Sequence, residues 1–206
     1  MLVFNPADHA PQDIYKLLVG SIVPRPIAFV STIDTNGIFN LAPFSFFTAA
    51  SANPPVVCFC PMVRRGASAK KDTLRNIEET REFVINIVSE EIGEQMNKCA
   101  AEVPPEVNEF EISGLTPVAS ELVRPPRVAE SHAQMECRLL QLVRVSEKPM
   151  GGTIVIGEVL RFHVAQGFVE DYRIDPAKLK AIGRMAGSTY ARTTDRFDME
   201  RPGPPR

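Results

Sequence analysis

The sequence predicts a mainly β protein, a β-barrel with a few short helices inserted between its strands. Strand-length runs rich in apolar and β-branched residues occur at 27–33, 83–88 and 153–164. Turn signals at Asn36-Gly37 and Gly151-Gly152 link neighbouring runs as hairpins. Strands do not alternate with helices of about ten residues, as the βαβ units of a doubly wound parallel sheet require. We therefore expect antiparallel strands.

The first elements are a short helix over residues 13–18 and the strand at 27–33. The chain turns at 34–37, because Asn and Gly tolerate the positive φ angles of hairpin turns, and returns in a strand over 38–42. Residues 43–48, Pro-Phe-Ser-Phe-Phe-Thr, are too aromatic for a solvated loop and too interrupted for a strand. A loop with hydroxyl donors, small residues and aromatic rings suits a ligand with a phosphate and a flat heterocycle.

The middle of the chain predicts two short helices around a buried strand. Asp72 is the expected N-cap of a helix over 73–79, with Leu74 and Ile77 on its apolar side. The β-branched run at 83–88 is the strand. A second helix over 90–100 carries Ile92 and Met96 on one face.

The second half begins with a loop-rich stretch over 102–126, anchored by Phe110, Ile112 and Leu115. A long bent strand follows at 128–145, and the run at 153–164 returns beside it. Asp175-Pro176 predicts a helix start, because Asp caps well and proline fits the first helical position. This helix is expected over 177–182, with Gly183 as its C-cap.

Length and composition fit one domain, with a core over about 20–192 and a tail over 193–206. The chain has 206 residues, 44% of them hydrophobic, and a net charge of −2. This charge provides no case for a nucleic acid or an anionic membrane partner. No apolar run approaches the ~20 residues of a membrane span. The first residues lack the basic and apolar regions of a signal peptide, so we expect a cytoplasmic protein.

The four cysteines, Cys58, Cys60, Cys99 and Cys137, are interpreted as buried free thiols. Cys58 and Cys60 would share one face of a strand, but metal sites use other spacings and a second ligand pair. We therefore assign no metal ligands. A redox role for Cys99 or Cys137 stays open, although no neighbouring residue supports it.

Two groups of polar residues are candidates for ligand contacts. Hydroxyls and an amide on the first two strands and the loop could bind a polar ligand tail: Ser31, Thr32, Asn40 and Ser45. A basic stretch just before a helix N-terminus could hold a phosphate: Arg64, Arg65, Lys70 and Lys71. Each hydroxyl or amide residue alone is better explained as an ordinary strand or turn residue, and the charges alone fit a solvated loop. Their combination predicts the site.

Near the C-terminus, Arg184 and Tyr190 lie among small residues, where Tyr190 could stack on an aromatic ligand or pack in a core or interface. The stretch lacks the glycine spacing of a dinucleotide-binding fingerprint. His9, His132 and His163 are scattered, and no Ser-His-Asp arrangement, carboxylate pair or P-loop is present. We assign no catalytic side chain.

Three stretches resemble the flavin reductase-like, FMN-binding split-barrel family, and its flavoredoxin-like branch in particular. They are PRPIAFVSTIDTNGIFNLAPFSFF, KDTLRNIEETREFVINIV and GRMAGSTYA, and with IVIGEV they span about 24–191. The resemblance implies a six-stranded antiparallel Greek-key split barrel and a homodimer with FMN near the subunit interface. It implies cofactor contacts from Ser31, Thr32, Asn40, Ala42, Ser45, Phe46, Phe47, Lys71, Asp72, Thr73, Arg184 and Tyr190.

The same resemblance implies an oxidoreductase in which NADH or NADPH donates a hydride transiently to flavin N5. Hydride transfer needs no side-chain acid or base, which agrees with the missing triad. One alternative is a flavoredoxin-like FMN electron carrier, reduced by a partner protein rather than by NAD(P)H. Another is an FMN storage or sensing module. The sequence contains no signature of the electron donor that separates them.

Overall fold

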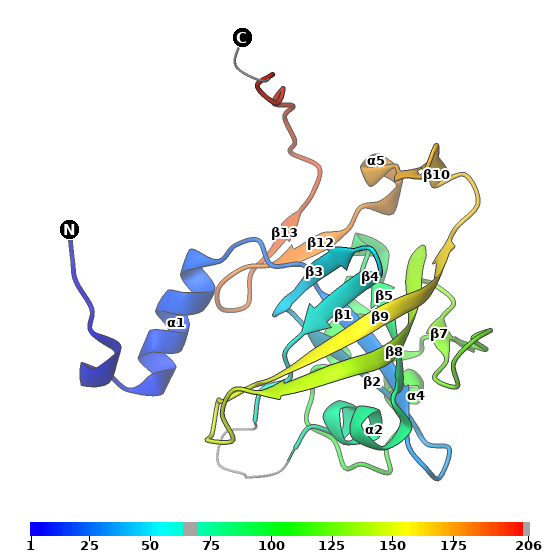
Figure 1. Ribbon diagram of the computed structural model, residues 1–206, viewed down its shortest axis with the longest axis horizontal. Helices are drawn as coiled ribbons and strands as arrows, with labels where there is room; N and C mark the ends of the chain where they lie inside the picture. Colours follow the sequence, from blue (N-terminus) through cyan, green and yellow to red (C-terminus); the bar gives the residue numbers. More distant parts are fainter. Residues whose placement is uncertain (64–69, 204–206) are drawn as a thin grey trace.

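A computed structural model describes residues 1–63 and 70–203 of the chain. Its centre is one sheet of antiparallel neighbours in the order β2-β1-β5-β8-β9-β4-β3 (Figure 1). The strands of this sheet are β1 (Ala28–Ile33), β2 (Phe39–Phe44), β3 (Phe47–Ala52), β4 (Pro55–Phe59), β5 (Glu82–Ile87), β8 (Ala133–Arg144) and β9 (Thr153–Val164).

Short helices and two-stranded ribbons surround the sheet. The helices are α1 (Pro11–Ser21), α2 (Asp72–Thr80), α3 (Gly93–Lys98), α4 (Glu109–Ser113) and α5 (Pro176–Leu179), with 3-10 turns at Pro6–Asp8 and Glu90–Ile92. The ribbons are β6–β7 (Pro117–Val118 with Arg127–Val128), β10–β11 (Val169–Glu170 with Arg173–Ile174) and β12–β13 (Ile182–Arg184 with Tyr190–Arg192).

The sheet curls into a barrel because its two edges are joined by very few residues. β2 and β3 lie at opposite ends of the strand order, yet only Ser45 and Phe46 separate them in the chain. The three steps from Phe44 to Phe47 span at most about 11 Å, so these ends of the two edge strands must lie close together. The prediction of a β-barrel with short helical insertions is confirmed.

Strand β1 is buried on both faces and divides the interior into two cores. Ala28 and Val30 point into the barrel, where Phe59, Phe83 and the α2 residue Ile77 pack. The intervening β1 residues face a second core beneath α3 and α4, formed by Ile27, Phe29, Leu41, Val88, Ile92, Met96, Cys99, Phe110, Leu115 and Val128. This double burial explains why the run at 27–33 shows no alternation of polar and apolar residues.

Several sequence-based predictions are confirmed. The strand at 27–33 and the buried strand at 83–88 are present as β1 and β5. Between β1 and β2, Asp34 Oδ1 accepts the N–H groups of Asn36 and Ile38, both at 2.8 Å, and Gly37 has φ +90°. Asp175 caps α5 by accepting the Ala177 N–H.

The segment after β2 is more regular than predicted. Strand β2 continues through Pro43 to Phe44, and β3 begins at Phe47, so only Ser45 and Phe46 form a connection. Pro43 is tolerated because β2 is an edge strand. The sheet accordingly has seven strands, one more than the six expected of the barrel.

Four further details differ from the predictions. Helix α2 begins at Asp72 with Lys71 as its N-cap, so Asp72 lies in the first turn. Helix α5 ends at Leu179, and Gly183 lies in β12, where its bare Cα fits against the Pro24 ring. Ile112 is exposed on α4 rather than an anchor. Of the four free cysteines, Cys58 and Cys60 are only partly buried.

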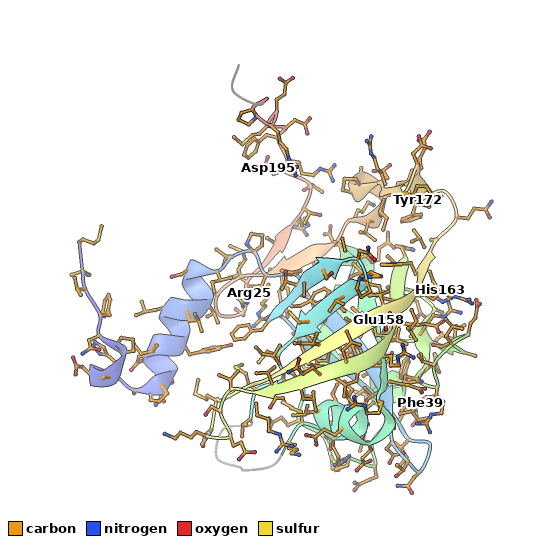
Figure 2. All side chains as sticks on the ribbon, viewed as in Figure 1. Arg25, Phe39, Glu158, His163, Tyr172 and Asp195 are labelled. Carbon is orange, nitrogen blue, oxygen red and sulfur yellow. The ribbon has the colours of Figure 1, made fainter. Side chains whose placement is uncertain are left out.

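Helix α1 extends to one side of the barrel and buries only Val19 (Figure 1). Residues after β13 run away from the barrel at Asp195, and Tyr172 lies at the tip of the β10–β11 hairpin (Figure 2). Within the described residues, no helix has the length and apolar character needed to cross a membrane.

Candidate functional site

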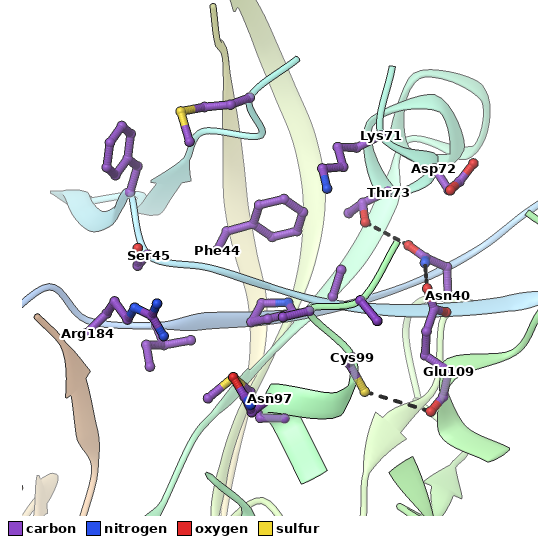
Figure 3. A pocket seen from close by; sticks show the side chains of 18 of the residues that line it. Asn40, Phe44, Ser45, Lys71, Asp72, Thr73, Asn97, Cys99, Glu109 and Arg184 are labelled. Carbon is purple, nitrogen blue, oxygen red and sulfur yellow. Dashed lines mark hydrogen bonds between the residues drawn. The ribbon is translucent and has the colours of Figure 1, made fainter. Parts of the chain in front are cut away.

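A cavity of about 320 Å³ opens between the end of β2, the start of α2, helix α3 and the β12–β13 ribbon. Figure 3 shows its walls, with Lys71 and Thr73 on one side and Ser45 and Arg184 on the other. Its size falls within the range of about 300–1,000 Å³ typical of small-molecule sites. Four segments distant in sequence therefore meet at one concave surface.

Nine of the twelve residues assigned from the sequence line this cavity: Asn40, Ala42, Ser45, Phe46, Lys71, Asp72, Thr73, Arg184 and Tyr190. Ser31, Thr32 and Phe47 do not line it. Ser31 is fully buried and donates to the Pro126 carbonyl, while Phe47 packs against the barrel core. Thr32 lies one step behind the wall, where its hydroxyl donates to Asn40 Oδ1 at 3.3 Å.

The Lys71 side of the cavity combines one cationic side chain with a helix N-terminus. Lys71 lines the wall at the N-terminus of α2 and approaches Glu102 Oε1 at 3.5 Å. The first N–H groups of a helix lack intrahelical partners, which favours an anion there. Lys70 instead pairs with Glu78 at 2.6 Å, outside this cavity. Arg64 and Arg65 fall outside the described residues.

A buried carboxylate orders the wall between α2 and β2. Glu109, in the first turn of α4, accepts the Asn40 amide at 2.7 Å and the Leu41 N–H at 3.0 Å. Thr73 in turn donates to Asn40 Oδ1 at 2.7 Å. Burial raises the pKa of Glu109 more than these hydrogen bonds lower it. The wall therefore holds an acidic group whose ionisation is costly.

Arg25 organises the opposite side. Its guanidinium is almost fully buried and donates to Ser45 Oγ at 3.2 Å, to Met185 O at 3.0 Å and to Val19 O at 2.7 Å. Because an arginine can only donate, Ser45 Oγ acts as its acceptor and the Ser45 proton is free to point elsewhere. Backbone bonds between Arg25 and Arg184 join β12 to the segment before β1.

The β12–β13 ribbon supplies the remaining polar groups. The Arg184 guanidinium lies 4.5 Å from the centre of the Tyr190 ring, a cation–π arrangement. The Tyr190 hydroxyl donates to Asn97 Oδ1 of α3 at 3.2 Å. A planar cation above an aromatic ring thus forms one boundary of the cavity.

Apolar and sulfur-containing side chains complete the lining, among them Phe44, Met62, Met96, Cys60 and Cys99. Burial raises the pKa of the Cys60 thiol and raises that of Cys99 to about 11. Both thiols are therefore neutral at physiological pH and act as small apolar groups. The described residues contain no cluster of three or more His, Cys, Asp or Glu side chains that could hold a metal ion.

Sequence reasoning missed Arg25 and Glu109, which fix the geometry of this site. Arg25 stands between two prolines, and no local pattern indicates its distant partners, Ser45 and Met185. Glu109 follows Asn108, the N-cap of α4, whose side chain accepts the Phe110 N–H. The only local signal for Glu109 is therefore this helix start within a loop-rich stretch. The cavity can accommodate a ligand with an anionic end, a flat apolar part and several hydrogen-bonding groups.

Comparison with known proteins shows what this chain is similar to. Residues 19–176 match the family model described as the flavin reductase like domain. The chain is similar to nitrilotriacetate monooxygenase component B from Bacillus cereus, with 40% identity and a TM-score of 0.91 over 97% of this chain and 98% of that chain.

Two more distant structures show the fold alone. A Shewanella frigidimarina protein described as having a split barrel domain has a TM-score of 0.82 at 22% identity, over 95% of this chain and 96% of that chain. Flavoredoxin of Desulfovibrio vulgaris has a TM-score of 0.73 at 23% identity, over 86% of this chain and 91% of that chain. The barrel of this protein is thus a split barrel of the kind seen in both.

Proposed function

This chain belongs to the flavin reductase-like family, and on that premise we propose that it binds FMN and reduces it with NADH or NADPH. The observation that supports FMN most directly is the pairing of a cationic helix N-terminus at Lys71 with a partly apolar cavity. A phosphate fits the first, and a flat ring system fits the second. Bound FMN would supply the redox chemistry by accepting a hydride.

The chain's own residues would bind and orient the cofactor. Lys71 and the first N–H groups of α2 are suited to the phosphate. Ser45 can donate its proton into the cavity, because its oxygen is already the acceptor for Arg25. Phe44 and Met96 provide apolar surface for the ring system. None of these groups needs to transfer a proton for a hydride to move.

We also propose a homodimer. Helix α1 and the turn after it expose four large apolar side chains to solvent: Leu17, Leu18, Ile22 and Val23. Strand β3 presents a second exposed surface, a sheet edge of mostly small residues. Such a surface is typical of a protein interface. Tyr15 of α1 also lines the cavity, so the interface would adjoin the site.

A second protein is proposed as the final electron acceptor. The similar Bacillus cereus protein is named as one component of a monooxygenase, which supports the idea that this chain also works with a partner. An electron carrier that takes its electrons from a protein, rather than from NAD(P)H, uses the same cavity. The reductase and the electron carrier differ only in the electron donor.

The test is an absorbance spectrum of the purified protein, loaded with FMN and then mixed anaerobically with NADH or NADPH. We expect a band near ~450 nm from bound FMN, which bleaches rapidly on addition of one of the two nucleotides. Retained colour with bleaching by dithionite alone would replace the reductase with the electron carrier. A protein that stays colourless and takes up no FMN would refute both.

A further inference from the structure

Glu109 is a buried charged group in the cavity wall that the proposed function leaves without a role. It comes from α4, and its carboxylate reaches across to β2, where each oxygen accepts one hydrogen bond. Only about 5% of its surface is exposed. The structure shows no cation in hydrogen-bond contact with its carboxylate among the described residues. Such a buried carboxylate, without a cationic partner in the described part of the chain, calls for a structural or functional role.

The carboxylate determines which way the Asn40 amide faces. Since an ionised carboxylate only accepts, the Asn40 group beside it must be the NH₂, and Oδ1 must face α2. Oδ1 there accepts the hydroxyls of Thr73 and Thr32 (Figure 3 shows the first of these bonds). The Asn76 amide holds Thr32 from the other side at 3.1 Å.

This orientation also fixes the polarity of Thr73. A threonine hydroxyl has one proton, and Thr73 gives it to Asn40 Oδ1. The oxygen of Thr73 can therefore only accept a hydrogen bond from a ligand in the cavity. Ser45, across the cavity, has the opposite polarity because Arg25 donates to it. The two hydroxyls thus require different groups on the ligand.

We propose that Glu109 is a positioning residue that, through Asn40, makes the Thr73 hydroxyl an acceptor for an N–H or O–H group of the flavin. This inference rests on the proposed function, because it assumes that the cavity holds a flavin. The groups that can meet Thr73 are the ribityl hydroxyls or a ring N–H, and phosphate oxygens are excluded as its hydrogen-bond partners. The phosphate is then left to Lys71 and the helix N–H groups.

The first experiment compares the wild-type protein with Glu109→Gln, using FMN and riboflavin as probes in fluorescence-quenching titrations. Glutamine supplies one acceptor where the carboxylate supplies two, so its NH₂ must face either the Leu41 N–H or Asn40. When the glutamine NH₂ faces Asn40, the Asn40 amide turns over and presents its NH₂ to Thr73. The Thr73 hydroxyl then accepts from Asn40 and its proton is no longer committed, so it need not act as an acceptor for the ligand. We expect the dissociation constants of both flavins to rise about tenfold.

A double-mutant cycle separates positioning from a general structural effect. Thr73→Val removes the acceptor, so Glu109→Gln added to it should change riboflavin affinity less than twofold. Glu111→Gln is the matched control, because Glu111 is exposed two residues away on the same helix and should leave both affinities unchanged. Additive losses in the cycle would overturn the proposal, since Glu109 would then not act through Thr73.

The pH profile of riboflavin binding provides a second readout. A protonated Glu109 can donate a hydrogen bond to Asn40, which allows the amide to turn over. The riboflavin affinity of the wild-type protein should therefore decline on acidification toward the affinity of Glu109→Gln. The affinity of the variant itself should not change with pH. The other titratable groups around this carboxyl are Asp72 and Lys71 of α2 and Cys99 of α3, and all three remain in the variant. Parallel profiles for the two proteins would overturn the proposal.

The outcomes also distinguish this inference from the proposed function. A wild-type protein that binds neither flavin refutes the proposed function itself. Wild-type binding with an unchanged Glu109→Gln affinity refutes only the role of Glu109. A loss confined to FMN, with riboflavin unaffected, would place the phosphate against Thr73 and overturn the assigned polarity.

Discussion

Two buried glutamates show how differently the same side chain is used in two regions of this protein. Glu136 on β8 is fully buried and accepts the N–H groups of Glu121 and Leu122, at 2.9 and 2.6 Å, and His163 Nε2 at 2.6 Å. Burial opposes its ionisation, but these hydrogen bonds outweigh burial and hold its pKa below the usual value. For Glu109 burial prevails, and the pKa is raised.

The difference lies in the donors that surround each carboxylate. Glu136 has two backbone N–H groups and an imidazole, which together fasten the loop at 121–122 to the barrel. Glu109 has one backbone N–H and the side chain of Asn40, which lines the cavity. The first carboxylate stabilises the fold, whereas the ionised form of the second costs stability at the place where a ligand would bind. Such a cost is expected at functional sites.

The strongest test of this contrast is Glu136→Ala, for which we expect the free energy of unfolding to fall by about 3 kcal/mol. The substitution leaves two partly buried N–H groups and His163 without their acceptor. Urea unfolding measures the loss, and flavin affinity should change less than twofold. Glu158→Ala is the control, because that carboxylate is more exposed and pairs, within the described part of the chain, only with Arg138. If Glu136→Ala lost flavin affinity together with stability, Glu136 and Glu109 would not have separate roles.

A substitution in the cavity should have the converse effect. We expect Lys71→Ala to weaken FMN binding about tenfold, since it removes a charge-assisted contact to the phosphate, while riboflavin affinity and unfolding free energy stay nearly constant. Lys70→Ala is the matched control, because Lys70 pairs with Glu78 outside the cavity. Equal losses for the two flavins would remove Lys71 from the phosphate site.

The pH dependence of stability should have opposite signs for the two carboxylates. Because the pKa of Glu136 is lowered, its stabilisation is present above the pKa of an unfolded glutamate and is lost as pH falls through the folded value. The pKa of Glu109 is raised, so its contribution is full at low pH and is lost as pH rises through the folded value. Unfolding free energies of Glu136→Gln and Glu109→Gln across pH measure both. Curves of the same sign would contradict the comparison.

The smallest effect concerns the rim of the loop that Glu136 holds. Arg124 pairs with Glu82 at 3.2 Å, and both side chains are partly exposed. Arg124→Ala should lower the unfolding free energy by about 0.5 kcal/mol or less, because exposed ion pairs contribute little. Its backbone N–H also donates to Glu82 and survives the substitution. A loss as large as that of Glu136→Ala would show that the rim, rather than the buried carboxylate, anchors the loop.

Much of the barrel was predictable because its strands and hairpin turns are local patterns in the sequence. The runs at 27–33 and 83–88 have the composition of buried strands, and the Asn-Gly turn needs only four residues to be recognised. The predicted site residues between Asn40 and Phe46, and those at 71–73, lie close together in the chain and now line one cavity. Local chemistry pointed to Asn40, Ser45 and Lys71, and the family resemblance implied the others.

The remaining features depend on contacts that no local pattern encodes. Ser31 resembles a ligand-binding hydroxyl in the sequence. In the structure β1 is buried on both faces, and the Ser31 hydroxyl donates to the Pro126 carbonyl instead of a ligand. Glu109 bonds to Leu41, 68 residues earlier in the chain. The strand at 47–52 has small polar and alanine residues of low strand propensity, and pairing with β4 determines it instead.

The bond from Arg25 to the Met185 carbonyl joins residues 160 positions apart, and it has a consequence for synthesis on the ribosome. Every strand of the large sheet ends by Val164, so the barrel can be assembled before β12 and β13 have emerged. The cavity wall that contains Arg184 and Tyr190 cannot yet exist at that stage. A nascent chain of this protein can therefore form its barrel first, and its binding cavity is complete only after β12 and β13 have emerged.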